Sequence, residues 1–152
     1  MKLELMKCKC SACGNDFLAP SLGDGAYGEF LLWSENGKVV YLNAFEDQTF
    51  KEVDNLLCLH SKTSALDSLD RAKILHKIYG KLACDRDESG SIFSIEASPP
   101  CPVCGSQAIA SWESINPAEV VDLELSNVTH FYWNSLTFDE KGKMVDMELS
   151  GL

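Results

Sequence analysis

The residues with the clearest chemical potential are two copies of a Cys-x-x-Cys-Gly sequence, at positions 10–14 and 101–105. Two residues between the cysteines let one tight turn present both sulfur atoms to a single ion. The glycine after each second cysteine permits a positive φ, which lets backbone amides point at sulfur. Two such turns supply the four thiolates of a tetrahedral site. The sequence therefore predicts one structural Zn²⁺, with the ligands Cys10, Cys13, Cys101 and Cys104.

A redox role is the main alternative for these cysteines, because a single Cys-x-x-Cys motif in a reducing compartment can act as a dithiol switch. Two copies that both end in glycine fit one metal site better than two independent redox centres. A site closed by four thiolates also leaves no coordination position for water. The pattern therefore favours structural zinc over catalytic zinc.

The other cysteines and histidines offer weaker possibilities. Cys8 precedes Cys10 by two residues on the same strand face, as an alternative ligand or a thiol near the site. Cys58, His60, His76 and Cys84 have the right types for a second metal site, but their spacing matches no compact finger. We expect these four to act separately.

The paired Cys-x-x-Cys-Gly turns resemble the two knuckles of zinc ribbon proteins, over about residues 5–18 and 96–113. The resemblance implies that each knuckle sits at the tip of a β-hairpin and that the metal holds the hairpins together. The chain departs from a compact ribbon because a long insert separates the knuckles. Closing that loop costs roughly 1.5 kcal/mol more than closing a loop of about 15 residues. Structural zinc contributes on the order of 10 kcal/mol, which outweighs this cost.

Length and composition indicate one α+β domain. The chain has 152 residues, of which 45% are hydrophobic, and this is enough for a single core. We expect a zinc ribbon from about 3–20 and 91–115, an inserted β-hairpin and helical lobe over about 21–90, and a mixed segment over 116–152. The first residues lack the apolar run of a secretion signal, and no segment is long enough to span a bilayer. A cytoplasmic protein with no membrane association is expected.

The charge distribution argues against nucleic acid as the partner. The formal net charge is −10, and no lysine or arginine occurs from Asp87 through Glu140, a stretch that includes the second knuckle. Affinity for nucleic acid depends mainly on lysine and arginine side chains that neutralise phosphates. This half of the zinc module would repel a phosphate backbone.

Local patterns in the first half predict two hairpins and two helices. Alternation of apolar and polar residues from Leu3 predicts a strand that leads to Cys10, and the chain is expected to return from the first turn through Phe17 and Leu18. Asn36-Gly37 predicts a tight turn between strands at 29–33 and 39–42. Asp47 suits the cap of a short helix that ends near Cys58. A second helix is expected from Ser64, with capping-box character at Ser64-x-x-Asp67, through Leu82. Its polar face carries Lys73, Lys77 and Lys81.

The second half is less regular. Residues 91–96 alternate and predict a strand that enters the second knuckle, and residues 108–112 predict the strand that leaves it. Asn116-Pro117 suits a helix start, although residues 120–125 could equally form a strand. Thr137-x-x-Glu140 predicts a terminal helix over about 138–147.

Two further segments match functional patterns only superficially. Residues 23–28 match the glycine spacing of a dinucleotide site, but Pro20-Ser21 precedes them and a β-rich run follows in place of a helix, so we expect a loop that could order on meeting a partner. Residues 130–133, His-Phe-Tyr-Trp, concentrate aromatic surface that could bind a partner, although burial is the default. No nucleophile or carboxylate at a recognisable spacing in the sequence supports a role for His130 as a general base.

These observations favour a non-catalytic zinc protein that binds another protein. The competing class is a nucleic-acid-associated zinc ribbon, whose phosphate contacts would be Lys7, Lys9, Lys73, Lys77 and Lys81. An enzyme with residues dispersed along the sequence is a third class that the pattern leaves open.

Overall fold

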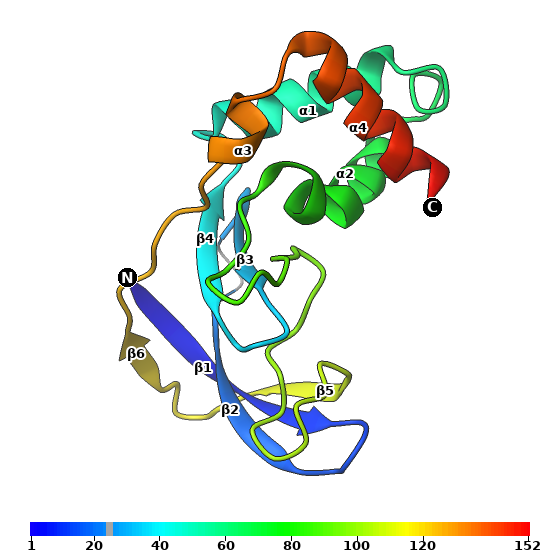
Figure 1. Ribbon diagram of the computed structural model, residues 1–152. Coiled ribbons are helices and arrows are strands. Elements are labelled where there is room, and N and C mark those ends of the chain that lie inside the picture. Colours follow the sequence, from blue (N-terminus) through cyan, green and yellow to red (C-terminus); the bar gives the residue numbers. More distant parts are fainter. Residues whose placement is uncertain (24–25) are drawn as a thin grey trace.

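The computed structural model describes residues 1–23 and 26–152, which form two antiparallel sheets and four helices. One sheet lies at the end that carries the cysteine turns, the helices gather at the opposite end, and a two-stranded sheet runs between them (Figure 1). This mixture of antiparallel sheets and helices agrees with the predicted class. Asp24 and Gly25, from the glycine-rich segment 23–28, lie outside the described residues.

The sheet at the cysteine end is built around β1 (Lys2–Cys10). β2 (Asp16–Ser21) pairs antiparallel with one edge of β1, and β5 (Ile109–Ser114) and β6 (Val120–Asp122) share the other edge. The pairing with β5 shifts register between Lys9 and Cys10, where β1 gives way to the first turn. The predicted first hairpin and the strand after the second knuckle are both confirmed.

The strand expected at residues 91–96 is not formed, so this expectation is wrong. Only Ser94 pairs with a neighbouring edge, in a bridge to Trp33, although the Phe93 side chain lies in the core. The second knuckle is therefore entered by irregular chain.

Of the two alternatives after Asn116-Pro117, the structure shows the strand. The peptide bond is cis, and residues 120–122 form β6 against β1.

The central hairpin joins β3 (Glu29–Trp33) to β4 (Val39–Asn43), as predicted. Its loop differs from the two-residue Asn-Gly turn that the sequence suggested. The Ser34 amide donates to the Lys38 carbonyl at 2.9 Å, and the Gly37 amide donates to the Ser34 carbonyl at 3.1 Å. Within the loop 34–38, Gly37 alone has a positive φ, at 79°. This is the longer loop in which a type I turn is followed by one left-handed glycine.

The first helix, α1 (Gln48–Leu59), is capped as expected, because the Asp47 carboxylate accepts hydrogen bonds from the amides of Thr49 and Phe50. The second, α2 (Ser68–Ala83), begins four residues later than predicted. Its N-cap is Asp67, whereas the Ser64 amide donates to the His60 carbonyl in the turns that follow α1. The capping box at Ser64 is therefore wrong.

Two helices complete the chain, α3 (Phe131–Asn134) and α4 (Phe138–Ser150). The predicted capping box of α4 is present: the Glu140 amide donates to Thr137 Oγ1 at 3.2 Å, and the Thr137 amide donates to Glu140 Oε1 at 2.9 Å. None of the described helices combines the length and apolar character needed to cross a membrane.

The hydrophobic core lies where the helices pack on the β3–β4 sheet. Burial of apolar side chains there supplies the main driving force for folding this end of the chain. Side chains with almost no exposed surface in this core are Leu32, Leu42, Val53, Leu57, Ile78, Tyr79, Trp133 and Val145.

Candidate metal centre

The two Cys-x-x-Cys-Gly turns meet at the end of the first sheet. Their four sulfur atoms all lie within 4.8 Å of one another. Cys10 Sγ is 3.5 Å from Cys104 Sγ, and Cys13 Sγ is 3.6 Å from Cys101 Sγ. Four sulfurs bound at about 2.3 Å to one tetrahedral Zn²⁺ would stand about 3.8 Å apart. The cluster therefore has the donor type, number and spacing to hold a metal ion.

The two turns have the same backbone geometry. The Gly14 amide donates to the Cys10 carbonyl at 2.9 Å, and the Gly105 amide donates to the Cys101 carbonyl at 2.8 Å. The two glycines have φ of 78° and 76°, which is why glycine follows the second cysteine in each copy. In each turn the first cysteine is buried and the second is exposed.

Hydrogen bonds join the two turns to each other and to the central hairpin. The Ser11 amide donates to the Ala108 carbonyl at 2.9 Å, which ties the first turn to the chain that leaves the second. Gln107 Nε2 donates to the carbonyls of Ser34 and Ser98 at 3.2 and 3.0 Å. The four thiols are thus positioned by contacts that do not depend on the metal.

Backbone amides stabilise thiolates within the cluster. The Cys13 amide is the largest influence on the Cys10 thiol and, against desolvation, lowers its pKa to about 6. The Cys104 amide likewise lowers the pKa of Cys101. The Asn15 amide favours the Cys13 thiolate, but desolvation and the neighbouring sulfurs raise the pKa of Cys13 to about 12. The resulting crowding of negative charge is what a divalent cation would relieve.

Cys8 is not part of the cluster. It is fully buried and lies opposite Phe17 on β2 and Trp112 on β5. Burial raises the pKa of the Cys8 thiol to about 11, so it behaves as a small apolar residue of the sheet.

The residues considered for a second metal site lie apart, and within 1–23 and 26–152 only the four knuckle cysteines converge. His60 Nε2 is 2.5 Å from Asp146 Oδ1 on α4. The His76 ring packs edge-on to Phe30, and burial lowers the His76 pKa. Cys58 is exposed, whereas burial raises the pKa of Cys84.

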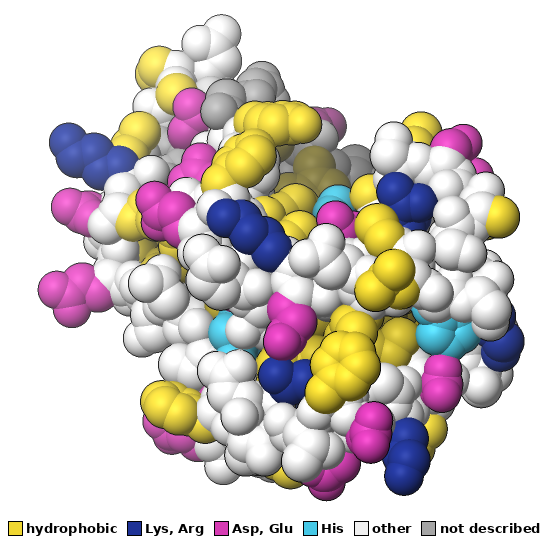
Figure 2. Space-filling view, turned by 90° about the horizontal axis from the view of Figure 1, so that it is seen from above, with side chains coloured by type: hydrophobic (Ala, Val, Ile, Leu, Met, Phe, Trp, Pro, Cys, Tyr) yellow, Lys and Arg dark blue, Asp and Glu magenta, His cyan; other side chains and the backbone are white. Residues whose placement is uncertain are grey.

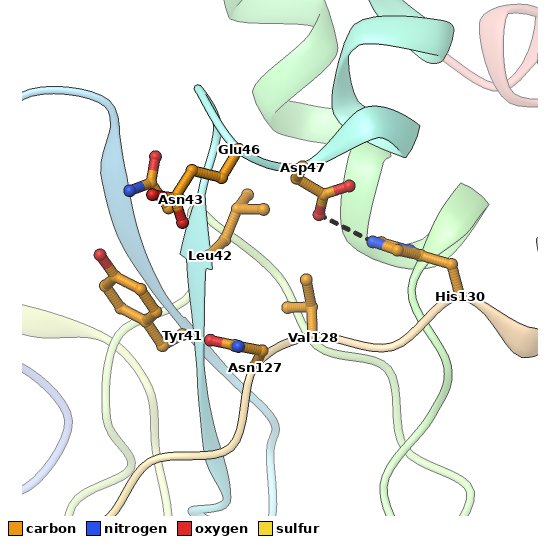
Figure 3. A pocket seen from close by; sticks show the side chains of 8 residues that line it. All are labelled: Tyr41, Leu42, Asn43, Glu46, Asp47, Asn127, Val128 and His130. Atoms are coloured by element: carbon orange, nitrogen blue, oxygen red, sulfur yellow. Dashed lines mark hydrogen bonds and ion pairs between the residues drawn. The ribbon is translucent and has the colours of Figure 1, made fainter.

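His130 lines a separate cavity of about 330 Å³ between β4 and the segment that precedes α3. Figure 3 shows its ring directed at Asp47. Its Nε2 is 2.8 Å from Asp47 Oδ2, and its Nδ1 is 2.7 Å from the Ala83 carbonyl. Burial lowers the pKa of His130, but these two acceptors, with the charge of nearby Asp85, raise it above its ordinary value. Both ring nitrogens face acceptors, which favours the protonated form of His130 and holds the segment before α3 against Asp47 and Ala83.

The aromatic run 130–133 divides between core and surface. Trp133 is fully buried and donates from Nε1 to Glu52 Oε1 at 2.5 Å, so it is not available as part of a partner-binding patch. Its neighbours Phe131 and Tyr132 are 78% and 62% exposed. A four-residue helix cannot direct all its side chains into the core. Trp133 is the side chain that enters the core, and it contacts Glu52 on α1 and Lys141 on α4.

Three of the five lysines considered for phosphate binding are paired with acids. Lys73 Nζ is 3.8 Å from Asp70 on α2, and Lys81 Nζ is 2.9 Å from Glu148 on α4. On the sheet, Lys7 pairs with Asp16 at 3.8 Å. Figure 2, a view onto the helical end, shows acidic, basic and hydrophobic side chains interspersed rather than one basic face.

Sequence reasoning missed Asp85, which follows α2 in a polar turn. Its carboxylate accepts hydrogen bonds from the amides of Phe131 and Tyr132 at 2.8 and 3.1 Å, and from Thr129 Oγ1 at 2.7 Å. Asp85 thereby fixes the start of α3. No local pattern signals this contact, because its partners are more than forty positions away.

No protein-family model matches the sequence, and comparison with curated proteins and with solved structures finds no significant match.

Proposed function

We propose that the chain is a non-catalytic protein-interaction module whose fold is completed by one structural Zn²⁺. The observation that carries this proposal is the convergence of Cys10, Cys13, Cys101 and Cys104 within 4.8 Å. A four-thiolate set suits Zn²⁺ and leaves no open position for substrate or water. Joining β1 to β5 through the metal would hold together parts of one domain that are distant in sequence.

The metal end has the character of a zinc ribbon in this proposal. The first turn lies at the tip of the β1–β2 hairpin, and β5 leaves the second turn to pair with β1. The departure is that irregular chain, rather than a strand, enters the second turn. The proposal includes a reducing compartment such as the cytoplasm, in which the cysteines stay available as thiolates.

Two features support protein rather than nucleic acid as the partner. The net charge is −10, and Lys73 and Lys81 of the α2 face and Lys7 of β1 are each paired with a carboxylate. Exposed aromatic side chains at the helical end offer the kind of anchor that protein interfaces use. The alternative, a nucleic-acid-associated zinc ribbon, requires a cationic surface that these pairs largely neutralise.

Elemental analysis tests the metal. We expect one zinc per chain after purification without chelator, and a stoichiometry near zero or near two would contradict the four-ligand assignment. Retention of a partner tests the function. The zinc-loaded protein, used as bait in a native lysate, should keep its stoichiometric partner after nuclease treatment and in about 0.5 M salt.

A triple Lys73→Glu, Lys77→Glu, Lys81→Glu variant serves as the matched bait. It should retain the same partner, because these lysines are a solvated face in this proposal. Loss of the partner after nuclease, or with this folded variant alone, would make the nucleic-acid alternative the better interpretation.

A further inference from the structure

A groove of about 500 Å³ lies at the helical end, where the end of α2 meets α3 and α4. Its apolar lining combines Leu82 from α2, Tyr132 and Trp133 from α3, and Met144 from α4. Three charged residues also line it, Lys81, Asp85 and Arg86. The groove is separate from the cysteine cluster and from the cavity beside His130.

The aromatic side of the groove is held on a fixed backbone. The amides of Phe131 and Tyr132 are bound by the Asp85 carboxylate, the preceding His130 bridges Asp47 and Ala83, and the following Trp133 is buried and bonded to Glu52. Tyr132 itself remains 62% exposed. An aromatic side chain displayed on an already ordered backbone loses little conformational entropy on binding, which is the property of an interface anchor.

The charges of the groove differ in how far they are already neutralised. The Asp85 carboxylate accepts three hydrogen bonds from the segment 129–132. Lys81 is paired with Glu148 at 2.9 Å. The Arg86 guanidinium donates to the Gly90 carbonyl at 3.1 Å, and among the described residues no carboxylate lies within ion-pair distance of it. On a chain of net charge −10, the groove therefore presents an uncompensated guanidinium beside apolar surface.

We propose that this groove docks a partner protein through a short segment in which an apolar or aromatic side chain stands next to a carboxylate. The apolar side chain packs on Tyr132 and Met144, and the carboxylate takes a bidentate ion pair with Arg86. This proposal rests on the proposed function and names the chemistry of the partner. The overall negative charge would disfavour a highly acidic partner, so the carboxylate is a local feature of the segment.

Selection from a library of short random peptides, with the zinc-loaded wild-type protein as bait, tests the proposal. The Tyr132→Ala, Arg86→Gln double variant is used for counter-selection. We expect the enriched peptides to share an apolar residue within one or two positions of Asp or Glu. The consensus peptide should bind the Tyr132→Ala variant and the Arg86→Gln variant each about tenfold more weakly than the wild type.

A double-mutant cycle then tests the ion pair itself. An Asp→Asn or Glu→Gln change in the peptide should weaken binding to the wild type about as much as Arg86→Gln does, and should have little further effect on the Arg86→Gln variant. Leu69→Ala and Lys77→Gln are matched controls, because both residues lie on α2 outside the groove and Leu69 is 65% exposed. Both controls should bind like the wild type, and every variant is checked for zinc content and circular dichroism.

Failure of this proposal is distinguishable from failure of the proposed function. Enriched peptides that lack an acidic residue, that carry basic residues, or that bind both groove variants normally would overturn the groove while leaving an interaction role intact. Failure to enrich any peptide would also overturn the groove proposal. The interaction role would still be tested separately, by whether a partner from the lysate is retained after nuclease treatment. A wild-type self-association that Tyr132→Ala abolishes would replace the partner with a second copy of this chain.

Discussion

Gly80, in α2, lies directly against the carbonyl group of Phe93. A Cβ atom at position 80 would stand 1.8 Å from the Phe93 oxygen and 2.8 Å from the Phe93 carbonyl carbon. The contact joins the helical end to the segment that leads into the second cysteine turn. The Phe93 side chain itself lies in the core.

This contact predicts that Gly80→Ala lowers the free energy of unfolding by about 3 kcal/mol or more, because backbone must move to admit the methyl group. Gly142→Ala in α4 is the matched control. Nothing lies within 4 Å of a Cβ built there, so this change should stabilise the protein by about 0.5–1 kcal/mol. Denaturant unfolding of the two variants measures both effects, and equal stability changes would contradict the packing described.

Replacing a predicted metal ligand should lower the free energy of unfolding more than replacing a cysteine outside the cluster. Cys101→Ser should abolish stoichiometric zinc and lower the free energy of unfolding by more than about 3 kcal/mol. The same change at exposed Cys58 should cost less than about 0.5 kcal/mol and keep the zinc. Thermal unfolding with parallel zinc analysis measures the difference. If zinc content is unchanged in Cys101→Ser, the ligand set is wrong.

The pairing of His130 with Asp47 predicts a defined pH dependence. Because the folded-state pKa of His130 is raised, its contribution to stability is complete below the ordinary histidine pKa of about 6.5 and is lost as pH rises through the raised value. The pKa of Asp47 is lowered, since the bonds and charge of His130 outweigh desolvation. Its contribution is therefore lost only when the pH falls through that lowered value.

Asp47→Asn isolates this effect, because asparagine still caps α1 but cannot pair as a charge. The variant should lose about 2 kcal/mol between about pH 4 and pH 6.5, and progressively less at higher pH. Unfolding measured across this range checks the result. A stability difference from the wild type that does not vary with pH would show that His130 is not charged in the folded protein.

Substitution of Trp133 by alanine should affect stability much more than the same substitution at nearby Phe131. Trp133→Ala removes a fully buried side chain and should lower the free energy of unfolding by about 3–5 kcal/mol. Phe131→Ala removes a side chain that is 78% exposed and should change it by less than about 0.5 kcal/mol. Chemical denaturation of both variants decides this. Comparable losses would mean that α3 is rotated from the orientation described.

Features signalled by short-range chemistry could be predicted from the sequence. The capping box at Thr137 and Glu140, the Asp47 cap and the hairpin around Gly37 depend on residues within a few positions of one another. The convergence of the cysteine turns was also predictable, because neither pair completes a tetrahedral site alone. The metal-ligand assignment itself stays a prediction.

Features set by distant contacts could not be predicted. Alternation at residues 91–96 shows which side chains can face the core, but not whether an edge is available for pairing along their length. The Ser64 amide bonds to the His60 carbonyl in the turns after α1, so α2 begins only after Asp67. The aromatic run identifies three large rings, and only the packing of α1 and α4 decides that Trp133 is the buried one.

Because the chain is synthesised from its N-terminus, one edge of β1 stays unpaired while the rest of the chain is being made. β1 leaves the ribosome before β5 and β6, which occupy its second edge and follow α2 in the sequence. Until then the nascent chain can complete only the β1–β2 hairpin, and Cys10 and Cys13 lack the second pair of thiols. An unpaired edge invites association with other chains. Lys9, exposed on β1, places positive charge beside that edge, where it disfavours such association before the sheet is complete.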